Sequence, residues 1–311
     1  MKYAKIGGQA VMEGVMMRYE NQYAVSVRKE DGEIETMTEK YESLGARAGV
    51  SKIPVLRGVF AFVDSLVLGM KTLMWSASFF EDEEEDVKTS KKAKDSEKKE
   101  SASDKFFMTL TVLFSVAMSI GLFMVLPFLV SNIFKKVIAS SLALGVLEGI
   151  VRLVIFMTYI LLISKMKDIQ RMFMYHGAEH KCINCIEHGD ALTPENAMKH
   201  TRFHKRCGTS FLFIVMFVSI VFFLVFFQIF PIEDLLLKVL CRVLLVPFIA
   251  GISYEIIQWA GRHDSGLVCL VSKPGFWMQK FTTKEPDEAM LEVAIASIEA
   301  IYDWKAFQKE L

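Results

Sequence analysis

The sequence predicts an α-helical integral membrane protein with four transmembrane helices and a small cytoplasmic α+β part. Apolar residues make up 52% of the 311 residues and the mean hydropathy is +0.33, which is too hydrophobic for an ordinary soluble protein. Four apolar runs, at 106–130, 137–164, 209–230 and 235–260, each reach the length of about 20 residues that a membrane-crossing helix needs. The polar remainder carries β and helical patterns towards the two ends of the chain.

These patterns divide the chain along its length. The expected segments are a β-rich region at 1–50, an amphipathic helix at 51–80, a charged linker at 81–105, a first pair of transmembrane helices at 106–164, a loop rich in His and Cys at 165–208, a second pair of transmembrane helices at 209–260 and a C-terminal tail at 261–311.

The N-terminal region is expected to form a small sheet. Apolar-rich runs at 10–18 and 23–29 predict two strands. Glu30-Asp-Gly-Glu33 is a hairpin-turn signal that leads to a third strand at 34–38.

The C-terminal tail is expected to contain an amphipathic helix. Leu291, Ile295 and Ile298 recur at helical spacing and would form its apolar face. Pro286 suits the first turn of this helix, and Thr283 is a candidate cap just before it. We expect the helix to dock on the N-terminal sheet.

Polar residues recur every seven positions in the helix predicted at 51–80 and give it one polar face. They are Arg57, Asp64, Lys71 and Ser78. A crossing helix would bury Asp64 and Lys71, each at a cost of about 2.5–3.5 kcal/mol near the bilayer centre. We therefore expect an interfacial helix; if it crossed instead, there would be five spans and the N-terminus would change sides. The linker at 81–105 is too charged to bury a core and is expected to be disordered.

Charged residues near the apolar runs predict the orientation. The loop at 165–208 is rich in Lys and Arg, whereas the short link at 231–234 carries only Glu233 and Asp234. The positive-inside rule then places this loop and both termini in the cytoplasm. The formal net charge is +0 and no basic domain stands out, which excludes nucleic acid as a main partner and leaves the lipid bilayer.

His176-Gly-Ala-Glu-His180 is the most informative motif. Histidines four residues apart lie on one face of a helix, so both imidazoles can reach one divalent metal ion, with zinc as the first choice. Glu179 lies on the neighbouring stripe and could act as a general base, because the order H-x-x-E-H also occurs in metal hydrolases of the inverted-zincin type.

Several residues could complete such a site at the inner membrane interface. One set joins Glu255 to His176 and His180 and leaves a fourth position for water, as in catalytic zinc sites. The remaining candidate ligands are His204, Cys207 and Glu187.

Other readings of the same segment stay open. Cys182 and Cys185 with His204 and Cys207 have nearly the spacing of a structural zinc knuckle. The polar residues could also form a hydrogen-bonded cluster without metal, or Cys207 could be a nucleophile with His204 as its base.

A separate pair of charged residues lies within a predicted span. Glu148 and Arg152 are four residues apart, so they can neutralise one another across one helical turn. A role for this pair in transport is a further hypothesis.

Five segments resemble the YqhQ-like family of bacterial membrane proteins. They are GGQAVMEGVMMR at 7–18, YHGAEHK at 175–181, RCGTSF at 206–211, SYE at 253–255 and TTKEP at 282–286. The family is a domain of unknown function described as predicted metal-dependent membrane enzymes. The resemblance implies a bacterial inner-membrane location and a metal site near His176, Glu179 and His180. Lys205 stands where the family pattern has proline, and Cys182 where it has a small polar residue.

The leading hypothesis is a metal-dependent membrane enzyme, most simply a hydrolase that works at the cytoplasmic interface. Glu179 would act as base while Arg206 or Lys181 holds an anionic group of the substrate. The alternative is a non-catalytic scaffold or membrane-protein biogenesis factor with a structural metal.

Overall fold

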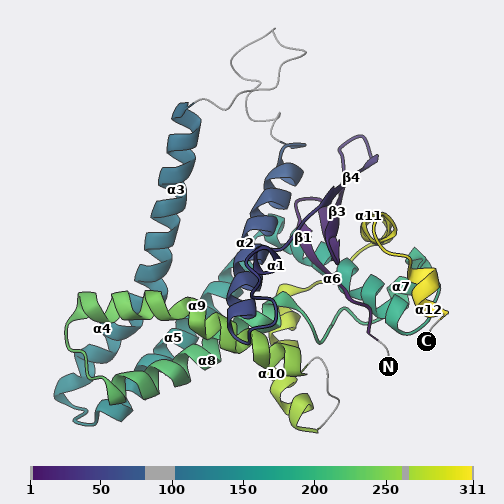
Figure 1. The fold of residues 1–311 in the computed structure, drawn as a ribbon. Coiled ribbons are helices and arrows are strands. Elements are labelled where there is room, and N and C mark those ends of the chain that lie inside the picture. The colour runs from purple at the N-terminus through teal and green to yellow at the C-terminus, as the bar shows by residue number, and fades with distance from the viewer. Residues whose placement is uncertain (1–2, 81–101, 261–265, 310–311) are drawn as a thin grey trace. The chain divides into compact units, whose positions relative to one another are not determined.

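The computed structural model describes residues 3–80, 102–260 and 266–309 (Figure 1). The chain forms two compact units. We call the first, which comprises Met1–Glu81, Ile160–Val218 and Pro247–Leu311, the sheet unit. The second, which comprises Asp82–Tyr159 and Ser219–Val246, is the helical unit.

The sheet unit contains a four-stranded antiparallel sheet in the order β1-β2-β3-β4. Its strands are β1 Ile6–Val11, β2 Gly14–Tyr19, β3 Gln22–Arg28 and β4 Ile34–Lys40. The single strand predicted at 10–18 is therefore wrong, because a tight turn at Met12 and Glu13 divides it. Glu13 has φ of 49°, and Gly14 follows where an added Cβ would lie 2.2 Å from the Ser26 carbonyl oxygen. The predicted turn before β4 is confirmed, with φ of 87° at Gly32.

Strands β2 and β3 have buried residues on both faces of the sheet. Successive strand residues point to opposite sides, and helices cover both sides. On one face, β1 and β2 pack against α6 (Lys167–Glu187) and α11 (Glu288–Glu299) in the larger hydrophobic core. On the other face, Met16 and Val25 pack with Leu68 of α2 (Leu56–Ala77).

The C-terminal tail docks on the sheet through α11, as expected. Ser297 donates a hydrogen bond to the Ala24 carbonyl oxygen, and Leu291 is fully buried in the larger core. The cap at Thr283 is wrong: Asp287 accepts from Met290 N and begins α11, whereas Thr283 bonds to Gln279 O at the end of α10 (Gly266–Thr282). Short helices complete this unit: α1 Leu44–Arg47, α7 Pro194–Lys199 and α12 Trp304–Gln308.

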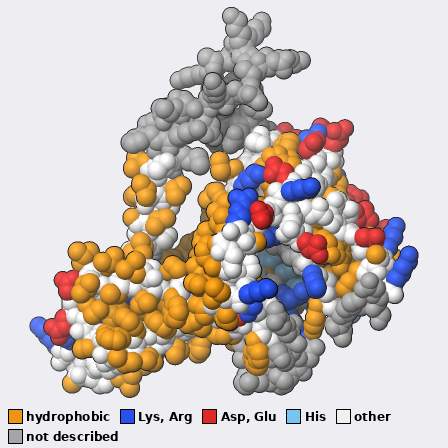
Figure 2. All heavy atoms as spheres, in the orientation of Figure 1, with side chains coloured by type: hydrophobic (Ala, Val, Ile, Leu, Met, Phe, Trp, Pro, Cys, Tyr) orange, Lys and Arg blue, Asp and Glu red, His pale blue; other side chains and the backbone are white. Residues whose placement is uncertain are grey.

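The helical unit is built from long apolar helices. Its elements are α3 Ala102–Ile120, the π-helical turn η2 Gly121–Val125, α4 Leu126–Ile133 and the 3-10 turn η3 Phe134–Lys136. It also contains most of α5 Ser141–Ile163, the second half of α8 Gly208–Ile229 and the first part of α9 Leu235–Ala260. Hydrophobic side chains cover most of this unit's visible surface, whereas charged side chains gather on the sheet unit (Figure 2). Leu236 is 78% exposed, which favours contact with lipid tails over water.

Five helices in the described residues are long and apolar enough to cross a membrane. They are Leu56–Ala77, Thr109–Lys136, Ser141–Ile163, Gly208–Ile229 and Leu235–Ala260. The protein is thus a mainly helical membrane protein with a small antiparallel sheet. Most of the linker predicted at 81–105 lies outside the described residues.

Candidate metal centre

Helix α6 carries the two histidines of the motif and is buried over its second half, from Tyr175 to Glu187. His176 and His180 stand one turn apart on the same face, and their ring centroids lie 4.4 Å from one another. The sheet and α11 cover other faces of α6, so its backbone gives the two rings a rigid support.

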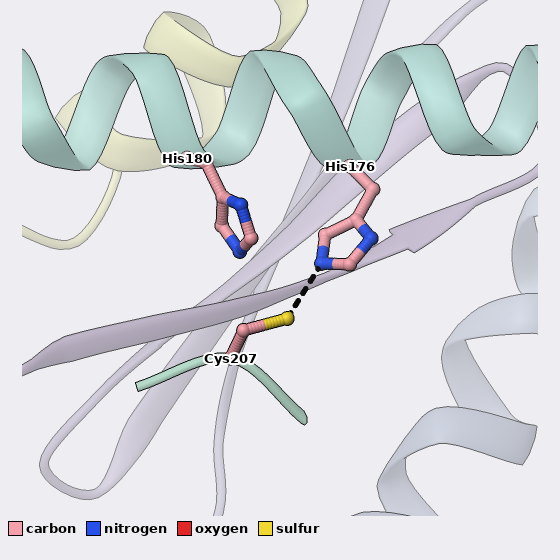
Figure 3. A group of neighbouring side chains, drawn as sticks. All are labelled: His176, His180 and Cys207. Carbon is pink, nitrogen blue, oxygen red and sulfur yellow. Dashed lines mark hydrogen bonds between the residues drawn. The ribbon is translucent and has the colours of Figure 1, made fainter. Parts of the chain in front are cut away.

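Cys207 comes to the same place from a later part of the chain. It precedes the first residue of α8, and its Sγ lies 3.1 Å from Nε2 of His176. Both imidazoles point from α6 towards this sulfur (Figure 3). One ligand atom from each of the three residues lies within 4.8 Å of the others. Ligands at 2.0–2.3 Å from a tetrahedral zinc stand about 3.3–3.7 Å apart, so the group needs only small shifts to bind one ion.

Backbone carbonyls hold both rings in the orientation that metal binding needs. Nδ1 of His176 lies 2.8 Å from the Thr282 carbonyl oxygen, and Nδ1 of His180 lies 2.6 Å from that of Arg202. A carbonyl oxygen can only accept, so each Nδ1 carries a proton. When a metal displaces the proton from Nε2, each ring therefore offers the Nε2 lone pair as its ligand. This is the support that metal-bound histidines usually have.

The electrostatics of the group favour a thiolate. Burial opposes ionisation of Cys207, but His176 and His180 together hold the pKa of its thiol well below the usual range. Burial likewise opposes protonation of His176, yet the adjacent Cys207 raises the pKa of this imidazole to about 9. Thr209 N also donates to the sulfur at 3.4 Å. The thiolate is the form of cysteine that binds metals.

Side chains of α6 also hold the loop that leads to Cys207. Lys181 donates to the carbonyl oxygens of Met198 and His200, both at 2.8 Å. Asn184 donates to those of Thr201 and Phe203. The loop has little secondary structure of its own, so these bonds fix its path.

A close approach at Gly177 brings in the segment that follows α10. A Cβ on Gly177 would lie 2.0 Å from the Lys284 carbonyl oxygen, so only glycine permits this crossing. Lys284 N donates to Phe173 O at 2.8 Å. The contact sets the position of Thr282, whose carbonyl oxygen orients His176.

Glu179 is buried beside this group. It is 6% exposed, and its carboxyl carbon lies 2.9 Å from the place a Cβ on Gly8 would take. Within the described part of the chain its carboxylate accepts no hydrogen bond. A carboxylate that neighbours the His176 imidazole and is not held by a donor can accept a proton.

Glu187 and its partners form a separate cluster at the end of α6. Its carboxylate accepts from Ala4 N at 2.8 Å and pairs with Arg206, and Nε2 of His204 lies 3.5 Å from it. The predicted candidates His204 and Glu187 therefore face one another. The His204 ring also lies beside the centre, with its centroid 5.6 Å from that of His180, but it is not in the group of three possible ligands.

The structure places the remaining candidates elsewhere in the sheet unit. Glu255 pairs with Arg57 and accepts from Val55 N. Lys181 pairs with Glu285 at 3.0 Å besides its loop contacts. The Arg206 guanidinium donates hydrogen bonds to the Glu187 carboxylate and to the Ala4 carbonyl oxygen.

The cysteines of the predicted knuckle are not brought together. Cys182 is packed in the larger hydrophobic core, and Cys185 lies against the carbonyl oxygens of Asp190 and Ala191. Burial raises the pKa of Cys185 to about 11, which keeps this thiol protonated at neutral pH.

A protein family matches most of this chain. The family described as "Protein of unknown function (DUF1385)" matches residues 53–304. The chain belongs to this family. It is also 32% identical over 308 residues to the uncharacterized protein YqhQ of Bacillus subtilis (strain 168). The aligned region covers 98% of this chain and 94% of that protein. No solved structure matches it.

Four of the five segments that carry the family resemblance meet at the candidate centre. Segment 7–18 supplies Gly8, 175–181 supplies both histidines, 206–211 supplies Cys207, and 282–286 supplies the Thr282 carbonyl. The supporting groups Thr282 and Arg202 were not predicted, because they act through backbone carbonyls that any residue type carries.

Proposed function

We propose that this protein is a metal-dependent membrane enzyme whose centre is formed by His176, His180 and Cys207. The observation that carries the proposal is the pair of Nδ1-to-carbonyl hydrogen bonds, which leaves both Nε2 atoms available beside the sulfur. Two nitrogens and one sulfur suit zinc, and three protein ligands leave a fourth position open.

Hydrolysis is the reaction that this donor set supports best. A zinc ion held there would supply Lewis acidity and lower the pKa of a bound water. We propose Glu179 as the residue that takes up the proton, since its carboxylate neighbours His176 and accepts no hydrogen bond from the described residues. The substrate would be a lipid-like molecule or a membrane peptide, because the centre directly precedes the apolar helix α8.

We further infer a four-span topology. Met12 N donates to Ser76 of α2 at 3.1 Å, and Asp64 of α2 accepts from Tyr41 OH at 2.7 Å, so α2 lies along the polar sheet. Three apolar segments separate the sheet from α6 in sequence: α2, 109–136 and α5. The sheet and α6 pack together, so an even number of these segments must cross, and α2 is the one that stays at the interface.

The sidedness follows from the charges. The loop at 165–208 is rich in Lys and Arg, so the sheet unit's polar part and both termini would lie in the cytoplasm of a bacterial cell. The four crossing segments are then 109–136, α5, α8 and α9.

A scaffold with a structural metal is the second candidate function. It is favoured by the internal engagement of Lys181 and Arg206, which leaves neither side chain clearly available to bind an anionic substrate. In this case the metal would only join α6 to the start of α8.

Elemental analysis of detergent-purified protein tests the metal centre. We expect about one equivalent of zinc or a similar divalent metal in wild type. The double variant His176→Ala/His180→Ala and the single variant Cys207→Ser should both lose it.

Two variants serve as matched controls. Cys185→Ser removes another buried thiol of α6, and His188→Ala removes the imidazole of the residue that caps the C-terminal end of α6. Neither side chain belongs to the group formed by His176, His180 and Cys207. Both should retain the metal. A folded wild-type protein that contains no metal after purification without chelator would refute the proposal.

A further inference from the structure

The helical unit contains a buried charge cluster that the candidate metal centre does not use. Glu148 and Arg152 of α5 form an ion pair of 2.8 Å, and Arg242 of α9 contacts the same carboxylate oxygen at 2.5 Å. Arg242 is only 1% exposed. Two guanidinium groups thus share one carboxylate, and the cluster keeps an uncompensated positive charge.

Neutral groups solvate this charge without cancelling it. Arg152 Nε donates to the Phe123 carbonyl oxygen at 3.0 Å, and Arg242 donates to that of Met124 at 3.1 Å. Both carbonyls belong to the π-helical turn η2, where the altered hydrogen-bond register makes them available. Nε of Arg242 is buried without a hydrogen-bond partner among the described residues.

The cluster lines a cavity of about 540 Å³. Four cationic side chains line it, Lys135, Arg152, Lys238 and Arg242, against only two carboxylates, Glu148 and Glu233. The rest of its wall is largely apolar and includes several aromatic rings. The Lys238 ammonium lies 4.8 Å from the ring centroid of Phe128 and 5.0 Å from that of Phe227.

We propose that this cavity binds a phosphate-type anionic headgroup. Arg152 and Arg242 are buried against the single buried carboxylate of Glu148. One uncompensated buried cation in an apolar helix bundle is costly unless an anion compensates it, and intramembrane charges usually mark binding sites. The cavity has the size of a small-molecule site. The cations of the cavity would bind the headgroup, and its aromatic wall would pack against the attached apolar chain. An anionic phospholipid offers both parts, whereas free phosphate offers only the charged group.

Native mass spectrometry of the full protein in neutral detergent tests the proposal. Phosphatidylglycerol, phosphatidylcholine and inorganic phosphate would be titrated separately. We expect phosphatidylglycerol to bind at least tenfold more tightly than phosphatidylcholine. The variant Lys135→Gln/Lys238→Gln should lose at least tenfold in that affinity, and it spares the fully buried Arg242, whose replacement could prevent folding.

Lys136→Gln is the matched control, because this lysine lies in the same turn η3 but does not line the cavity. It should bind like wild type. Phosphate binding that depends on Lys135 and Lys238 would support the anion site and identify a soluble source. Equal binding of the two lipids, or equal binding by the double variant and wild type, would overturn the proposal.

Discussion

At the residue scale, α6 buries two carboxylates in opposite surroundings. Glu187 accepts from Ala4 N and pairs with Arg206, so its charge is compensated. Glu179 has no such partner within the described residues, although it is 6% exposed. A carboxylate beside an imidazole that no donor holds is a candidate functional group.

The substitution Glu179→Gln separates the catalytic role from a structural one. We expect full metal content, a melting temperature equal to or above that of wild type, and at least a 100-fold loss of hydrolysis once a substrate is found. The melting temperature and metal content can be measured before any substrate is known. A marked loss of stability would argue that Glu179 is structural.

Glu187→Gln gives the opposite expectation on the same helix. It leaves Arg206 without its buried counter-charge, so the free energy of unfolding should fall by about 3 kcal/mol. Thermal or denaturant unfolding in detergent measures this loss. If Glu187→Gln were as stable as wild type, the ion pair between Glu187 and Arg206 would not stabilise the fold.

At the element scale, the candidate centre depends on how the segment after α10 crosses α6. The crossing is possible because Gly177 has no side chain, and it places the Thr282 carbonyl oxygen at Nδ1 of His176. Glycine has a low helix propensity, so Gly177 costs α6 some helix stability, but it permits the contact with the segment after α10.

Gly177→Ala is expected to disturb the centre through this crossing. The new methyl group would lie 2.0 Å from the Lys284 carbonyl oxygen and force the segment away. Zinc affinity should fall about 10- to 100-fold, as for other groups that orient metal-bound histidines, and competition with a chelator measures it. Gly7→Ala is the control, because nothing lies within 4 Å of the added Cβ. Equal affinities for the two variants would contradict the expectation.

At the scale of the whole molecule, packing constrains the membrane topology. The sheet contacts both α2 and α6, although three apolar segments lie between β4 and α6 in sequence. Only an even number of crossings among those three satisfies this packing.

Site-directed labelling with a membrane-impermeant maleimide tests the topology in spheroplasts. Glu30→Cys before β4 and Ser78→Cys after α2 should both stay unlabelled until lysis, whereas Lys136→Cys should react in intact spheroplasts. The unsubstituted protein gives the background from the native cysteines. Opposite labelling of Glu30→Cys and Ser78→Cys would mean that α2 crosses the membrane.

Features that depend on neighbouring residues could be predicted from the sequence. Apolar runs longer than a bilayer indicated the long helices, and the spacing of His176 and His180 placed both rings on one helical face. The turn before β4 and the apolar face of α11 followed from equally local signals.

Contacts between residues far apart in the sequence follow from the packing of the folded chain. Arg57 lies far from Glu255 in sequence, yet the two side chains form an ion pair, which keeps Glu255 away from the predicted metal site. Cys207 lies beside the histidines instead. The supporting Thr282 carbonyl depends on a crossing at Gly177, and a backbone carbonyl has no residue-type signature. Such contacts form between segments whose separate sequence patterns carry no information about each other. They depend on how the sheet, α6 and the end of α10 pack together.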